Sequence, residues 1–117
     1  MSDYRQGLSQ KGINPHNALA DDGWTIVSGE PRQFLRIDYG DFEQGPVVGI
    51  WQCTPGIIEM AALPYHEYVT VYAGEVVATL DGGDEVTLGP GDSFYVPKGS
   101  AIRWDVRETV SKSLLVC

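Results

Sequence analysis

Metal ligands and nucleophiles are few in this chain of 117 residues. It holds two histidines, His16 and His66, and two cysteines, Cys53 and Cys117. A site with three imidazole ligands cannot be built from two histidines, and the spacing of the cysteines matches no zinc or redox motif. We therefore expect no metal and no other cofactor, with a buried thiol at Cys53, a loose terminal thiol at Cys117, and both thiols reduced.

A reduced metal site built on His66 and its neighbour Glu67 is also disfavoured. Successive side chains on a strand point to opposite faces of the sheet. His66 and Glu67 would both face one interior only if Pro64 introduced a bulge. The sequence therefore favours a metal-independent protein.

Short strands must position these residues. The chain has 14 glycines and 7 prolines beside 43% apolar residues, a composition typical of many strands joined by tight turns. From Trp24 onward apolar segments alternate with turn residues, and Asp81-Gly82-Gly83-Asp84 is the clearest hairpin, because glycines supply the positive φ of a tight turn. Nine or ten strands are expected, over 24–27, 34–39, 47–53, 57–63, 67–72, 75–80, 85–88, 93–97, 101–106 and 112–117.

This length suits one domain with one modest core. Residues 1–23 show no sustained period and contain the turn signal Asn14-Pro15, so we expect an N-terminal arm that packs on the domain or on a partner subunit. Residues 24–117 are expected to form an all-β, antiparallel sandwich or barrel.

The charge of the chain limits its partners. Sixteen acidic against eight basic side chains give a net charge of −8, which opposes binding to nucleic acid or to an anionic membrane. No apolar run is long enough to span a bilayer, and the polar start lacks the pattern of a secretory signal, so we expect a cytoplasmic protein. The charged groups at 38–43 and 107–112 are interpreted as solvated faces.

Two segments resemble the paired motifs of the cupin barrel. In the first, Glu67 is followed by Gly74; the second is Gly91, five residues, then Pro97-Lys98-Gly99. Segments 49–56, 91–100 and 104–112 closely resemble the cupin group of the (S)-ureidoglycine aminohydrolase cupin domain and the ethanolamine-utilisation cupins. The resemblance covers about residues 24 to 116 and implies a single cupin (jelly-roll-like) antiparallel β-barrel of unassigned activity.

The same resemblance bears on the metal. A typical cupin binds a divalent ion with a His-x-His pair, a glutamate and a third histidine, leaving open positions for substrate. In this chain the pair falls within residues 60–64, which hold no histidine, and the third histidine is replaced by Ile102. Of the family's ligands only Glu67 remains.

The resemblance also implies a pocket. If Glu67 points inward as the family's glutamate does, Tyr65, Val69 and Val71 share its face. Desolvation there raises a carboxyl pKa, so Glu67 is the candidate general acid or base, and the Tyr65 phenol is expected to orient the substrate. The expected ligand contacts begin with Trp51 and Trp104, two tryptophans that the group keeps, and with Cys53 and Ile102, which share their faces. Phe94, or alternatively Tyr95, is expected to form an aromatic wall, and His66 to lie at the barrel mouth.

Two functions are compatible with these residues. In one, the chain binds a small polar or nitrogen-containing metabolite, with a ligand cation over Trp51 or Trp104 and Glu67 as its counter-charge. In the other, it is a non-catalytic binding or assembly module with a vestigial pocket. In both, sheet edges and half-covered faces favour a homodimer.

Overall fold

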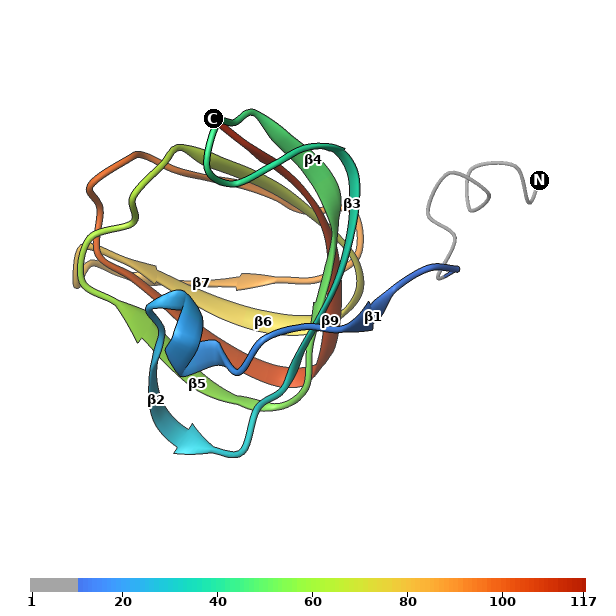
Figure 1. The fold of residues 1–117 in the computed structure, drawn as a ribbon. Helices are drawn as coiled ribbons and strands as arrows, with labels where there is room; N and C mark the ends of the chain where they lie inside the picture. The colour runs from blue at the N-terminus through green and yellow to red at the C-terminus, as the bar shows by residue number, and fades with distance from the viewer. Residues whose placement is uncertain (1–10) are drawn as a thin grey trace.

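Two long strands organise the structure, a computed structural model that describes residues 11–117. Strand β6 (Glu67–Leu80) and strand β9 (Ile102–Val116) pair antiparallel over nearly their whole lengths. Each passes through both halves of a curled sheet (Figure 1). The sequence pattern predicts two strands within each of these segments, and the structure joins each pair into one bent strand.

The bend lies at Gly74. The register between β6 and β9 shifts three times between Val71 and Val76. Gly74 has a φ of +82°, and a Cβ placed there would lie 2.0 Å from the carbonyl oxygen of Thr109 on β9. Only glycine lets the two backbones approach so closely while the chain turns. The bend divides the sheet into two leaves that curl toward each other.

Each leaf contains one half of β6 and one half of β9. The first leaf, here called the β4 leaf, adds β1 (Asn14–Pro15), β3 (Gln33–Gly40), β4 (Val47–Cys53) and β8 (Ser93–Val96). The second, the β5 leaf, adds β2 (Thr25–Gly29), β5 (Gly56–Met60) and β7 (Glu85–Leu88). The nine strands of the described residues form one antiparallel sheet, and the expected all-β, antiparallel architecture is confirmed.

The core lies between the two leaves. Side chains alternate along β9, where Ile102, Trp104 and Val106 are buried on the β5 leaf and Leu114 and Val116 are buried on the β4 leaf. This period of two directs one face of each leaf to the interior. No helix of the described residues is long and apolar enough to cross a membrane.

The predicted hairpin is present, and one predicted strand is shorter than expected. The hairpin at residues 81–84 is present: Asp81 and Gly82 have positive φ, and the Gly83 N–H donates to the Leu80 carbonyl at 2.9 Å. The expected strand over 57–63 ends earlier, at Met60. Proline at 64 cannot donate to a ladder, and residues 61–66 form the loop that leads into β6.

The described part of the expected arm packs on the barrel. Strand β1 pairs with β3, and a short 3₁₀ helix, η1 (Leu19–Asp22), follows it with Leu19 buried. Figure 1 shows this segment crossing one side of the barrel. Residues 1–10 of the arm lie outside the described residues, and the division at residue 23 stays a prediction.

Candidate functional site

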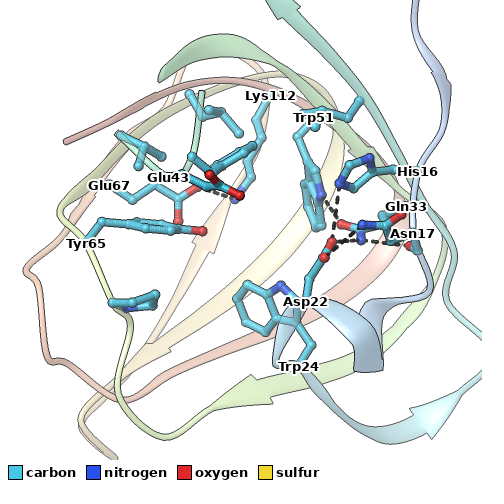
Figure 2. A pocket seen from close by; sticks show the side chains of 15 residues that line it. His16, Asn17, Asp22, Trp24, Gln33, Glu43, Trp51, Tyr65, Glu67 and Lys112 are labelled. Atoms are coloured by element: carbon cyan, nitrogen blue, oxygen red, sulfur yellow. Dashed lines mark hydrogen bonds and ion pairs between the residues drawn. The ribbon is translucent and has the colours of Figure 1, made fainter. Parts of the chain in front are cut away.

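A cavity lies on the inner side of the β4 leaf. Its volume is about 400 Å³, within the range of small-molecule sites. Figure 2 shows its lining. The lining comes from η1 and the segment before it, from the residue that precedes β2, from β3, β4, β6 and β9, and from two loops: His16, Asn17, Asp22, Trp24, Gln33, Leu35, Phe42, Glu43, Trp51, Pro64, Tyr65, Glu67, Lys112, Leu114 and Val116.

A buried ion pair lies in the wall of this cavity. Lys112 Nζ on β9 is 3.5 Å from Glu67 Oε2 on β6, and the two side chains are only 4% and 6% exposed. Both residues occupy inward positions of the strand alternation. A buried charge without a partner is very costly, so each group makes the other tolerable in the interior.

Two indole rings hold the ammonium group. Lys112 Nζ lies 4.6 Å from the centre of the Trp51 ring and 4.1 Å from that of Trp104, so two cation–π contacts supplement the ion pair. Burial lowers the pKa of Lys112 below its ordinary value, and the nearby Glu67 carboxylate opposes this effect. This lysine therefore releases a proton more readily than a surface lysine.

Two further titratable groups adjoin the pair. Burial raises the pKa of Tyr65 well above its ordinary value, and the charges of Glu67 and Asp22 act in the same direction. Burial raises the pKa of the Cys53 thiol to about 12, with the charge of Lys112 opposing it. Tyr65 is thus a protonated donor at neutral pH, and Cys53 is a neutral thiol that is a poor nucleophile.

A hydrogen-bond network fixes the opposite wall. The Trp51 indole N–H donates to Gln33 Oε1 at 2.9 Å, and Gln33 Nε2 donates to Asp22 Oδ2 at 2.6 Å and to the Asn17 carbonyl at 2.9 Å. Asp22 also accepts from the Asn17 amide and pairs with His16 at 3.3 Å. Through Gln33 the network joins the arm to the tryptophan that packs on Lys112, as the dashed lines in Figure 2 show.

The structure brings part of the predicted set together. Trp51, Tyr65 and Glu67 line the cavity. Trp104 does not belong to the lining but packs on Lys112. Cys53 is fully buried in the core and does not belong to the lining.

The other predicted residues lie elsewhere. Phe94 packs edge-on against Trp104 at 6.0 Å between ring centres, and Ile102 lines a separate pocket beside Met60. The His66 ring is exposed, accepts the Lys98 N–H and hydrogen-bonds the Tyr95 hydroxyl. His66, the residue before β6, is thus exposed, whereas Glu67, the first residue of β6, is buried, as the strand alternation predicts.

Lys112 is the main residue that sequence analysis misses. The interpretation of 107–112 as a solvated face is wrong at its end, because Lys112 is buried while Arg107 is exposed. The strand alternation contained the signal: Lys112, Leu114 and Val116 share one face of the last strand. Phe42 and Glu43, from the other charged group, line the cavity mouth, and Phe42 lies 6.0 Å from Tyr65 between ring centres.

The residues present do not fit the three-histidine metal centre of typical cupins. Met60 and Ile102 occupy two of the regions where that centre has histidines. The remaining glutamate, Glu67, faces an ammonium group. Within residues 11–117 no three His, Cys, Asp or Glu side chains are grouped as metal ligands.

This two-leaf barrel has the architecture of the cupins. A protein of unknown function from Pseudomonas syringae pv. tomato superposes with a TM-score of 0.76 at 23% identity, over 92% of this chain and 45% of that one. The EutQ protein of Clostridium difficile gives 0.61 at 19% identity, over 74% and 62%. A putative ethanolamine utilization protein from Salmonella typhimurium gives 0.62 at 17%, over 89% and 95%. The chain therefore spans less than two thirds of the length of the Pseudomonas syringae and Clostridium difficile proteins.

The family follows from the sequence match. The model described as the EutQ-like cupin domain matches residues 40–113, and the chain belongs to this family. No curated protein matches it. The resemblance to the ethanolamine-utilisation cupins is thereby confirmed, and the chain is a small cupin of unassigned activity.

Proposed function

We propose that this cupin binds a small, polar, nitrogen-containing metabolite in the cavity and transfers a proton on it without a metal, in the cytoplasm. The observation that carries the proposal is the buried pair of Lys112 and Glu67 in the cavity wall. Apolar residues of the same volume often stabilise an interior as well as an ion pair does. The ion pair in the cavity wall is therefore better explained by a role in proton transfer than by a contribution to the stability of the fold.

The charges of the lining favour a ligand with a basic nitrogen. Three carboxylates, Asp22, Glu43 and Glu67, face the cavity, and Lys112 offsets one of them. Trp24 and Tyr65 add aromatic surface. The position over Trp51 or Trp104 where a ligand cation is expected is occupied by the Lys112 ammonium group itself. A ligand cation is therefore directed to the other two lining carboxylates, Asp22 and Glu43, and to the aromatic surface of Trp24.

The pair can act in both directions of a proton transfer. Glu67, as the carboxylate, takes a proton from the bound metabolite, and the Lys112 ammonium donates one to another atom of the same molecule. Protonated Tyr65 donates a hydrogen bond that orients the substrate. The net change is an isomerisation or the first step of an elimination or hydrolysis.

Thermal-shift screening tests this proposal. Amines, ureido compounds and small acids are tested on the wild type, on Glu67→Gln, on Tyr65→Phe and on Glu85→Gln, a control at an exposed position of β7. We expect a nitrogen-containing compound to raise the melting temperature of the wild type and the control, with the increase lost in Glu67→Gln. Tyr65→Phe removes one hydroxyl and keeps the ion pair, so it covers the case in which Glu67→Gln fails to fold. No increase with any compound would argue against the pocket.

The second candidate function is a non-catalytic, dimeric assembly module. Large apolar side chains exposed on the barrel surface favour it, Tyr39 and Tyr68 among them. It predicts that no compound shifts the melting temperature and that Glu67→Gln affects stability alone.

A further inference from the structure

The cavity lining contains a strong nucleophile, the side-chain amine of Lys112. Among the described residues that line the cavity there is no serine, threonine or cysteine. Cys53 lies in the core as a neutral thiol, and the His16 ring pairs with Asp22 at 3.3 Å. The Lys112 side chain is 4% exposed and belongs to the lining, so a small molecule reaches its Nζ from the cavity. An amine in this position attacks the carbonyl carbon of an aldehyde or ketone once it has lost its proton.

The residues around Lys112 supply the proton acceptor and the donor that this attack needs. Glu67 Oε2 lies 3.5 Å from Nζ, so the carboxylate takes the ammonium proton directly. Tyr65 lies on the same side of the cavity as Glu67, as Figure 2 shows, and its phenol is protonated at neutral pH. This phenol is the donor that polarises a carbonyl oxygen. Burial lowers the pKa of Lys112, which increases the fraction of neutral amine.

The surroundings of Lys112 also fit a product with a positive charge on the nitrogen. An iminium ion, the protonated C=N product of an amine and a carbonyl group, carries the same single charge as the ammonium group that it replaces. Its nitrogen therefore keeps Glu67 as a counter-ion and the rings of Trp51 and Trp104, centred 4.6 and 4.1 Å from Nζ, as cation–π partners. A buried charge is costly without a partner, so a reaction that conserves the charge leaves the interior balanced.

We propose that Lys112 forms an iminium ion with the carbonyl group of a small aldehyde or ketone that also carries a basic nitrogen. The inference rests on the proposed function, since it uses the same cavity and metabolite and names the reacting group of that metabolite. The basic nitrogen is directed to the lining carboxylates of Asp22 and Glu43, and the carbonyl group to Lys112. An amine without a carbonyl group binds in the cavity but forms no covalent bond.

The step balances in atoms and in charge. The Lys112 ammonium gives a proton to Glu67, and the neutral amine forms a C–N bond with the carbonyl carbon. The former carbonyl oxygen takes that proton and a second one from the nitrogen, the C–O bond breaks, and water leaves. The products are the iminium ion, one water molecule and the Glu67 carboxylate. The iminium ion draws electrons from the neighbouring carbon, from which Glu67 takes a proton in the proposed proton transfer; water later hydrolyses the C=N bond.

Reductive trapping on the wild-type protein tests the covalent bond. Sodium cyanoborohydride converts an iminium ion into a stable secondary amine, and peptide mass spectrometry locates that amine in the chain. The probes are aminoacetone and hydroxyacetone, which differ in an amino against a hydroxyl group. The chain has three lysines, Lys11, Lys98 and Lys112, and the exposed Lys98 is an internal control in every sample.

We expect aminoacetone to label Lys112 at least ~10-fold faster than Lys98 at neutral pH, because each unit by which an amine pKa falls raises its neutral fraction about tenfold. The ratio of the two rates cancels the intrinsic reactivity of a probe. This ratio should be lower with hydroxyacetone, which lacks the basic nitrogen, and the preference should disappear in urea. Labelling of the folded protein that favours Lys98, or that is equal at the two lysines, would overturn the proposal, and no variant has to fold for this result.

Hydrogen–deuterium exchange separates this inference from the proposed function. NMR in deuterated water follows exchange at the carbons beside the carbonyl group of aminoacetone, with the wild type and with Glu67→Gln. Preferred labelling of Lys112 without catalysed exchange would support the iminium ion and overturn the proton transfer by Glu67. A melting temperature raised by amines without preferred labelling of Lys112 would overturn the iminium ion and leave the proposed function in place.

Discussion

Lys112 and Glu67 form their ion pair across neighbouring strands that do not set them opposite each other. Glu67 lies opposite Val116, and Lys112 lies opposite Val71, four residues further along the strand pair. The long lysine side chain reaches along the sheet between two indoles to bring its Nζ within 3.5 Å of the carboxylate. The pair therefore depends on the packing of Trp51 and Trp104 as well as on strand register.

Removing the ammonium group should destabilise the barrel strongly. Lys112→Met leaves Glu67 buried without a counter-charge, so we expect its free energy of unfolding to fall by about 3–5 kcal/mol. Urea denaturation measures the loss. Lys98→Met, at an exposed position, should change stability by less than ~0.5 kcal/mol. The double variant Lys112→Met/Glu67→Gln should recover part of the loss; a double variant as unstable as Lys112→Met would mean that the cation–π packing matters more than the ion pair.

The bend of β6 should require glycine at position 74. Gly74→Ala places a methyl group against the Thr109 carbonyl, so a loss of more than about 4 kcal/mol or failure to fold is expected. Gly82→Ala is the matched control, since its φ is also positive and nothing lies within 4 Å of the added Cβ; backbone strain alone should cost about 1–3 kcal/mol. Equal losses in the two variants would contradict the close approach at the bend.

Cys53 should make stability fall at alkaline pH. Its pKa is about 12 in the folded state against an ordinary 9.0, so above pH 9 the unfolded chain loses this proton while the folded chain retains it. The contribution is present below pH 9 and is lost as pH rises toward 12. The stability of the wild type should therefore decrease relative to Cys53→Ala over this interval, in urea melts at stepped pH.

Thiol labelling gives an independent check on the same residue. At pH 8 a thiol reagent should modify the exposed Cys117 quickly and Cys53 only after denaturation. Rapid labelling of two thiols in the native protein would contradict the burial of Cys53.

The wall behind Trp51 should be sensitive to charge at position 33. Gln33→Glu replaces the amide that donates to Asp22 at 2.6 Å with a second carboxylate, so we expect a loss of about 1–3 kcal/mol at neutral pH. The loss should shrink as pH falls, because a protonated carboxyl donates to its neighbour again. Thermal melts between pH 4 and pH 8 measure this, with the exposed Gln44→Glu as the control. A loss independent of pH would exclude charge repulsion as its cause.

Several elements were predictable from sequence because their causes are local. Strands β4 and β7 coincide with the predicted segments, since turn residues bound both of them. The 81–84 hairpin depends on a turn that two adjacent positive-φ residues determine. The placement of Glu67 inside and His66 outside follows from strand alternation, and the loss of the cupin histidines is visible in the chain itself.

The contents of the cavity depended on long-range packing. No local pattern indicates that residues 16–22 of the arm, strand β3 and the loop at 42–43 meet around the same space as Glu67. Sequence alone treats Lys112 as a solvated charge, because the cost of burying it is offset only by Glu67, Trp51 and Trp104. Glu67 and Trp51 lie 45 and 61 positions away in the chain, and Trp104 lies on the other leaf. Sequence thus determined the strands, their alternation and the missing metal ligands, whereas the tertiary structure decided which charge meets Glu67, since burial and pairing are properties of the assembled interior.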